Sequence, residues 1–364
     1  MTVKGSTTTC TECGTACVWK WYKCWEPASY PCDACHDKVL CKACHGKYPL
    51  FIVKDTTTDS GKQALDNGSI QNHCQACFQL KSTLDFTSIY TRVPDKSNES
   101  SKKDPSGVLF VFGHGGGACR MLYDSHAKEL YQRYGHASIL LDFPGHGTLV
   151  DKELTVESAV QQVGNVLADS GITDEKNTKI IDPNYQKVIF VGTSLGAYLG
   201  FPIVERYQHL LAGAILIDCG QNVGPDCQFH VKMGCALLSF LTKHYSNAAL
   251  MKMMINVSKK SPADYKLVET CYGAGQFFEQ GEAQVRVLRT IAPAEILPKI
   301  KSVPILFMNG SEDHRNSEDK WLSLCVCRDK SELKVYEGGD HFFTHDSRFL
   351  EDIFQRIDTF TKRL

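Results

Sequence analysis

The segment KVIFVGTSLGAYLG, residues 187–200, joins an apolar run to a Gly-x-Ser-x-Gly pentapeptide centred on Ser194. A serine is flanked in this way by chance about once in 200, so the pentapeptide alone is weak evidence. Its setting is more specific, because KVIFVG predicts a buried strand and LGAYLGFPIVERY predicts the start of a helix. At a sharp strand-to-helix turn the serine is exposed, and the flanking glycines avoid Cβ clashes. We therefore predict that Ser194 is a nucleophile.

Apolar runs rich in β-branched residues continue along the chain and alternate with helical stretches. Buried strands joined by crossover helices form a parallel sheet covered on both faces, which is an α/β architecture. TSIY (87–90) is expected to add an early strand, and the charged stretch 91–107 an exposed loop. The other predicted strands are VLFVFGH (108–114), ASILLDF (137–143), KVIFVGTS (187–194), AGAILID (212–218), VPILFMNG (303–310) and ELKVYEGG (332–339).

Two of these strands end at residues that suit a serine nucleophile. Asp313 follows VPILFMNG and His341 follows ELKVYEGG, and reactive groups gather at the carboxyl ends of parallel strands. We predict that His341 takes the Ser194 proton and that Asp313 holds the imidazole and stabilises its cation. Other ionisable residues stand nearby, with His345 as the reserve base and Glu312 as the reserve acid. The remaining neighbours are His314 and Asp340.

A glycine-rich turn, His114-Gly115-Gly116-Gly117, follows the strand VLFVFGH. In serine hydrolases such a turn donates a backbone N–H to the oxyanion, together with the residue after the nucleophile. We predict that Gly116 and Leu195 are these donors, with Gly115 as the second candidate in the turn. His114 is expected to be a structural hydrogen-bonding residue.

These motifs, with Asp142-Phe-Pro-Gly-His-Gly147, resemble the α/β-hydrolase superfamily over residues 79–364, and the last motif resembles monoacylglycerol-lipase-like esterases. The resemblance implies an α/β-hydrolase fold and cleavage of an ester, thioester or amide, without an organic cofactor. It also implies a helical cap at about residues 222–297, where the chain is too long for a plain crossover. The apolar, Met-rich stretch 235–257 there indicates either a pocket for a hydrophobic or lipid-like ester or packing of the cap against the body.

Ten of the 17 cysteines lie in the first 77 residues, mostly in Cys-x2-Cys pairs. Because tetrahedral structural zinc needs four ligands, four pairs predict two zinc ions in a separate domain, residues 1–78. Cys17, Cys24, His36, His45 and His73 are alternative ligands. The predicted ligands are Cys10, Cys13, Cys32, Cys35, Cys41, Cys44, Cys74 and Cys77.

The order and spacing of these pairs resemble cross-braced two-zinc modules, and FYVE domains most closely. The resemblance implies that pairs one and three share one ion and that pairs two and four share the other. The segment Ala28–Asp33 lacks the basic run with which FYVE domains hold an inositide phosphate, and the spacing before the fourth pair is long. Binding of that inositide is therefore not expected. The zinc module is expected to contact either a membrane surface or a partner protein.

The net charge of -1 and pI near 6.9 exclude the basic field of a nucleic-acid-binding protein. No signal peptide and no stretch of 18 consecutive apolar residues is apparent, so a cytoplasmic protein is expected, with peripheral contact to endomembranes left open. Two alternatives to a serine hydrolase remain at this point. One is a non-catalytic receptor or scaffold with a hydrolase-like body, and the other is a RING-like ubiquitin ligase.

Overall fold

The structure is a computed structural model that describes residues 90–94, 106–149, 152–220, 223–244, 281–313 and 318–364, and six short strands before these. The short strands form three antiparallel pairs. The eight predicted zinc ligands lie outside the described residues, so the two-zinc module stays a prediction. The pairs are β1 (Thr8–Thr9) with β2 (Ala16–Cys17), β3 (Tyr30–Pro31) with β4 (Val39–Leu40), and β5 (Leu50–Ile52) with β6 (Ile70–Asn72).

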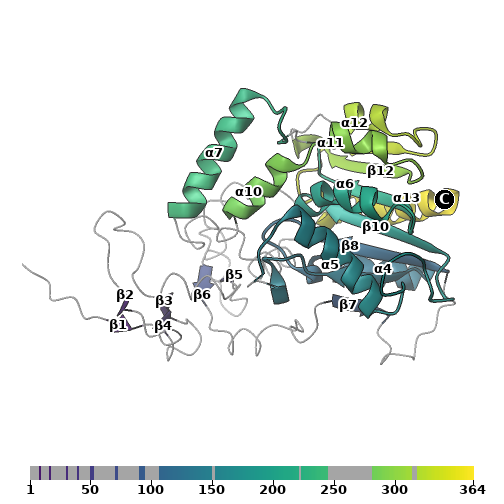
Figure 1. Cartoon of the computed structure of the whole chain (residues 1–364), viewed down its shortest axis with the longest axis horizontal. Coiled ribbons are helices and arrows are strands. Elements are labelled where there is room, and N and C mark those ends of the chain that lie inside the picture. The colour runs from purple at the N-terminus through teal and green to yellow at the C-terminus, as the bar shows by residue number, and fades with distance from the viewer. Residues whose placement is uncertain are drawn as a thin grey trace, which may run out of the picture.

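A seven-stranded sheet forms the centre of the larger part of the molecule (Figure 1). Its strand order is β13-β12-β11-β10-β8-β9-β7, and every neighbouring pair is parallel except β9 with β7. Since consecutive parallel strands require crossovers, helices cover both faces of the sheet. The strands are β7 (Tyr90–Val93), β8 (Val108–Gly113), β9 (Ala137–Leu141), β10 (Lys187–Thr193), β11 (Leu211–Ile217), β12 (Ile305–Gly310) and β13 (Glu332–Tyr336).

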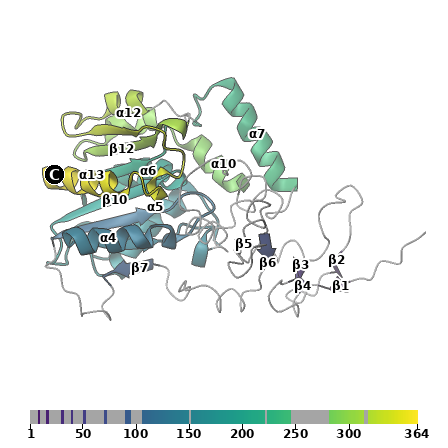
Figure 2. The same cartoon turned by 180° about the vertical axis from the view of Figure 1, so that it is seen from behind.

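The two faces of the sheet bury separate hydrophobic clusters. Alternate residues of β8 point to opposite faces, so that Leu109 and Val111 join one cluster while Phe110 and Phe112 join the other. The first cluster includes α5 (Val156–Asp169), α6 (Leu195–Tyr207) and α12 (Glu318–Leu324). The second includes η1 (Arg120–Tyr123), α4 (Asp124–Tyr134) and α13 (Leu350–Arg363), and Figure 2 brings α13 to the front. The central strands are therefore buried on both sides.

Local sequence signals explain where two of the covering helices begin and end. Helix α5 starts with a capping box, in which Thr155 Oγ1 accepts a hydrogen bond from the Ser158 N–H at 3.0 Å and Ser158 Oγ accepts one from the Thr155 N–H at 2.9 Å. Helix α4 ends at Gly135, whose φ of 74° is the left-handed conformation that glycine adopts without a Cβ penalty. Helix α5 thus begins at its capping residue, and α4 stops where the chain must turn toward β9.

The connection from β11 to β12 is the long one and carries additional helices. Helix α7 (Phe229–His244) packs beside α10 (Gly281–Thr290), and α10 also contacts α6 (Figure 1). α11 (Pro293–Ile296) and η3 (Leu297–Lys299) complete the crossover. Helices therefore occur where the sequence predicts a cap, and the placement of a cap over the site stays a prediction. No helix in the part of the chain that the structure describes is both long and apolar enough to cross a bilayer.

The six strands predicted from 108 onward are confirmed, with ends that shift by a few residues. The structure describes the early strand at Tyr90–Val93; of the predicted range 87–90 only Tyr90 is among the described residues, and residues 91–93 of the stretch expected to be a loop belong to β7. β7 is an edge strand in which only Val93 is fully buried. The apolar signal that marks the inner strands is therefore weak here.

Candidate active site

Ser194 occupies the turn between β10 and α6. Its φ of 52° and ψ of -114° are unusual for a non-glycine residue, as expected of a serine held at a sharp turn. Each flanking glycine touches backbone: a Cβ on Gly192 would lie 2.3 Å from the Gly196 carbonyl oxygen, and one on Gly196 would lie 2.5 Å from the Gly113 carbonyl oxygen. The Ser194 N–H donates to the Ile217 carbonyl at 2.8 Å, which joins the turn to the end of β11. The turn is thus a nucleophile elbow in geometry.

The structure brings Ser194, His341 and Asp313 into one hydrogen-bonded line. His341 Nε2 lies 3.1 Å from Ser194 Oγ, and His341 Nδ1 lies 3.0 Å from Asp313 Oδ2. The Asp313 side chain is 7% exposed and that of His341 is 24% exposed, so the line runs from the interior toward the surface. Since Asp313 accepts from Nδ1–H, Nε2 is left with the lone pair that can take the serine proton.

Two adjacent strand ends place these partners. Asp313 closes η4 (Ser311–Asp313), directly after β12, and His341 follows β13. The Glu312 N–H donates to the Gly339 carbonyl at 2.8 Å, and a Cβ on Gly310 would lie 2.3 Å from the same carbonyl oxygen. The two loops therefore pack backbone against backbone, which sets the distance between Asp313 and His341.

The glycine-rich turn after β8 is held by the Asp142–Gly147 loop. Buried Asp142 accepts hydrogen bonds from the Arg120 N–H at 2.7 Å and the Thr148 N–H at 3.0 Å, and it forms an ion pair with the Arg120 guanidinium. His114 Nδ1 donates to the Gly115 carbonyl at 2.8 Å, and its Nε2 accepts from the Phe143 N–H at 3.1 Å. His114 is thus a structural residue, as predicted, and burial lowers its pKa.

The predicted oxyanion donors lie in two places, at the start of α6 and in the glycine-rich turn at the end of β8. Leu195 is the first residue of α6, and the N–H groups of a first helical turn have no partner within the helix. Gly115 and Gly116 lie in the turn at the end of β8, and the Gly113 and His114 carbonyls touch the position of a Cβ on Gly196. The two loops are thus in contact beside Ser194, while the donor roles of Gly116, Gly115 and Leu195 stay predictions.

Comparisons with known proteins identify the family of the chain. The alpha/beta hydrolase family matches residues 108–353. The chain belongs to the alpha/beta hydrolase family. No curated protein sequence matches it.

Several solved structures share the fold. MGS-M2, an alpha/beta hydrolase enzyme from a Medee basin deep-sea metagenome library, is similar with a TM-score of 0.55 and 16% identity over 75% of this chain and 93% of that one. A thermophilic esterase from Thermogutta terrifontis has a TM-score of 0.55 and 17% identity over 75% and 92%. The enol-lactonase of Burkholderia xenovorans has a TM-score of 0.54 and 12% identity over 75% and 95%. At these identities the likeness establishes the common fold.

The reserve residues of this alpha/beta hydrolase lie away from the hydrogen-bonded line. His345 is buried within η5 (Phe343–His345) against His126, with 4.9 Å between ring centroids, and burial lowers its pKa well below the usual value. Glu312 is exposed, and Asp340 Oδ1 accepts a hydrogen bond from the Phe342 N–H at 2.9 Å. His314 lies outside the described residues. Of the described neighbours, only Asp313 and His341 join Ser194 in the hydrogen-bonded line.

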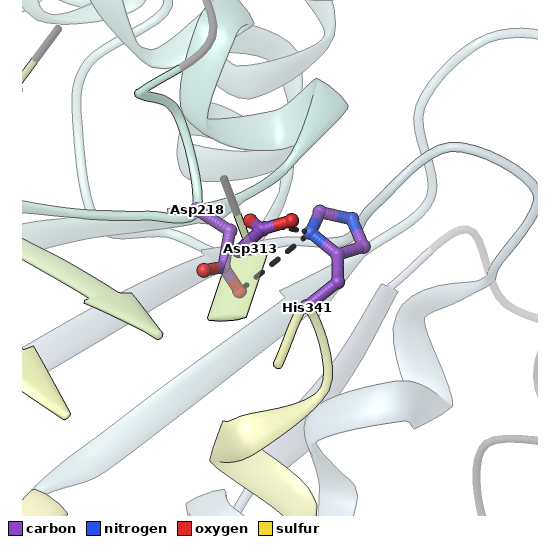
Figure 3. Close-up of side chains that lie close together, drawn as sticks. All are labelled: Asp218, Asp313 and His341. Atoms are coloured by element: carbon purple, nitrogen blue, oxygen red, sulfur yellow. Dashed lines mark hydrogen bonds and ion pairs between the residues drawn. The ribbon is translucent and has the colours of Figure 1, made fainter. Parts of the chain in front are cut away.

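Sequence reasoning missed one residue of the site, Asp218. It follows β11 directly and is fully buried, and its Oδ2 lies 3.9 Å from His341 Nδ1. Figure 3 shows its carboxylate and that of Asp313 facing the same ring nitrogen. An acidic residue at the last position of the predicted strand AGAILID was the signal that could have identified it.

Proposed function

We propose that this alpha/beta hydrolase is a serine hydrolase that cleaves a carboxylic ester or thioester through an acyl-enzyme. The observation that carries the proposal is the line of hydrogen bonds from Ser194 through His341 to Asp313. Esters, thioesters and amides are the substrates that a serine nucleophile attacks, whereas an epoxide hydrolase of this fold uses an aspartate. The esterase and lactonase structures of the same fold are consistent with this chemistry.

The proposed reaction begins with attack of Ser194 Oγ on the acyl carbon while His341 Nε2 takes the hydroxyl proton. The carbonyl π electrons move to oxygen, and the resulting oxyanion accepts hydrogen bonds from the Leu195 and Gly116 N–H groups. As the tetrahedral intermediate collapses, the bond to the leaving group breaks, and the His341 imidazolium gives its proton to the departing alcohol or thiol. Asp313 stabilises this cation throughout.

Deacylation repeats these steps with water as the nucleophile. His341 takes one proton from the water as its oxygen attacks the acyl carbon, and the same proton then passes to Ser194 Oγ as the acyl–serine bond breaks. The products are a carboxylic acid and free Ser194. No organic cofactor is needed, because every proton and electron pair is accounted for by the triad, water and substrate.

A hydrophobic acyl or lipid-like ester is the proposed substrate class. Helix α7, which lies between β11 and β12, exposes a stripe of apolar side chains, with Phe229 77% exposed, Met233 59% and Leu237 59%. Their spacing of four residues places them on one face of the helix. An exposed apolar stripe of this kind supports an amphipathic or lipid-like substrate.

Labelling by a fluorophosphonate probe tests the enzyme proposal. The probe phosphonylates an activated serine, so the wild type should be labelled and Ser194→Ala should not. Asp340→Asn is the matched control, since the amide keeps an oxygen that can accept from the Phe342 N–H. No labelling of the wild type, or equal labelling of Ser194→Ala, would instead support the non-catalytic receptor or scaffold.

The N-terminal region is proposed to hold two structural zinc ions and to bind a membrane surface or a protein partner. This proposal rests on the spacing of its cysteine pairs, and the zinc ions take no part in the proposed reaction.

A further inference from the structure

A second buried carboxylate faces the same nitrogen of His341 as Asp313 does. Asp218 Oδ2 lies 3.9 Å from His341 Nδ1, whereas Asp313 Oδ2 lies 3.0 Å from it (Figure 3). A separation of 3.9 Å is too long for a hydrogen bond, so Asp313 holds the imidazole and Asp218 acts on it through space. One carboxylate oxygen of Asp218, one of Asp313 and one ring nitrogen of His341 all lie within 4.8 Å of one another.

The fold holds Asp218 in this position from several sides. Its φ is 53°, a left-handed conformation that aspartate tolerates better than most residues. Its N–H donates to the Met308 carbonyl at 2.9 Å, and its Oδ1 accepts from the Gly310 N–H at 3.4 Å. Both partners belong to β12, the strand that leads to Asp313. Asp218 is therefore aligned by the same strand that aligns the acid.

The elbow is tied to Asp218 through the residue before it. The Ser194 N–H donates to the Ile217 carbonyl at 2.8 Å, and Asp218 is the next residue in the chain. Nucleophile and both carboxylates are thus connected by backbone contacts among the ends of β10, β11 and β12, and the base is joined to them by the hydrogen bond from the Glu312 N–H to the Gly339 carbonyl. Such a site is preorganised, because no rearrangement is needed when charge develops on the imidazole.

We propose that Asp218 is a positioning residue that stabilises the His341 imidazolium and partly replaces Asp313 when that carboxylate is lost. The inference rests on the proposed serine hydrolase function, since the imidazolium forms only when His341 takes the Ser194 proton. Two carboxylates close together repel each other, and a cation between them relieves this repulsion. A fully buried carboxylate also loses its hydration, so its attraction to a nearby cation is stronger than it would be in water.

The test combines Asp218→Asn, Asp313→Asn, both together, His341→Ala and Asp340→Asn. The rate of fluorophosphonate labelling and kcat/KM for an activated p-nitrophenyl ester are measured across pH. We expect Asp218→Asn to lose about tenfold, Asp313→Asn about 100-fold, and the double variant on the order of 10⁴-fold, more than the product of the two. The Asp340→Asn control should match the wild type.

The pH profile separates electrostatics from structure. Asp218→Asn replaces a carboxylate by an amide of the same shape, so the imidazolium loses stabilisation and the acidic limb of the kcat/KM profile moves to lower pH. A purely structural role for Asp218 would lower the rate without moving this limb. An unchanged limb, or a double variant no slower than Asp313→Asn, would overturn the inference.

A second comparison needs no change at Asp218. If Asp218 supports the imidazole when Asp313 is lost, Asp313→Asn should be labelled at least about tenfold faster than His341→Ala. Equal rates would overturn the inference even if Asp218→Asn did not fold. If labelling depends on Ser194 but not on Asp218, the proposed function stands and the role of Asp218 is refuted. If the wild type is not labelled at all, both the proposed function and the role of Asp218 are refuted.

Discussion

Ser194 has a positive φ in a sharp turn that requires glycine on both sides of it. Its positive φ exposes Oγ between β10 and α6, and the close backbone approaches at Gly192 and Gly196 leave no space for a side chain. The glycines of the pentapeptide therefore have a steric function that is distinct from the chemistry of the serine. This separation allows the elbow to be tested without changing any reacting atom.

Gly192→Ala should abolish fluorophosphonate labelling and lower stability by about 1–3 kcal/mol, because the new methyl group must displace backbone atoms. The control is Gly234→Ala in the exposed part of α7, where a Cβ would meet nothing within 4 Å. That control should keep wild-type labelling and gain up to about 1 kcal/mol, since alanine has the higher helix propensity. Thermal unfolding and labelling measured side by side check both; normal labelling of Gly192→Ala would contradict the steric explanation.

The sequence predicted Ser194, Asp313 and His341 because each stands in a recognisable motif at a strand end. Asp218 could not be predicted in this way, because its place in the site arises from the pairing of β11 with β12. This pairing brings it beside Gly310, which lies almost a hundred positions later in the chain. Residue patterns along one strand do not contain that information. The Asp142 loop is recognisable as a sequence motif, but the motif does not predict the hydrogen bond from the Arg120 N–H to Asp142.

At the scale of elements, the buried central strands were the most predictable part of the fold. Strands β8 to β12 are buried on both faces and read as continuous apolar runs. The edge strand β7 was harder to delimit from the sequence, because its burial is partial and the β9 residues that pair with it lie 45 to 51 positions later in the chain. Pairing with β9, rather than its own composition, extends β7 to Val93.

The Cys-x2-Cys turns of the N-terminal region make a quantitative prediction. The purified full-length chain should contain about two zinc ions, because four pairs supply eight thiolates. Cys10→Ser should lower this to about one, whereas Cys327→Ser, in the hydrolase part of the chain, should leave it unchanged. Elemental analysis of the dialysed protein measures the ratio, and fewer than one zinc per wild-type chain would contradict the module.

For the molecule as a whole, buried histidines should couple stability to pH. Burial lowers the pKa of His126 to about 4 and that of His146 to about 3, against 6.5 for an exposed imidazole. Both rings are neutral in the folded protein at pH 6, while the unfolded chain begins to bind protons below pH 6.5. The unfolded state therefore gains protons first, and the free energy of unfolding falls as pH drops from about 6.5 to about 4.

Urea unfolding at a series of pH values measures this coupling. Each buried imidazole contributes a slope of up to about 1.4 kcal/mol per pH unit in that interval. His146→Gln should lower the slope, and His209→Gln, which replaces an exposed ring, should keep the wild-type slope. A His146→Gln profile parallel to that of the wild type would show that the histidine is protonated in the folded protein.

Ser194 and His341 are 147 positions apart in the chain, and they meet only because β10 and β13 belong to one sheet. During synthesis Ser194 emerges long before His341, its proposed base. In the proposed mechanism a growing chain therefore cannot hydrolyse an ester until β13 has been released and has joined β12. The order of the strands would thus delay the proposed activity until translation of the sheet is complete.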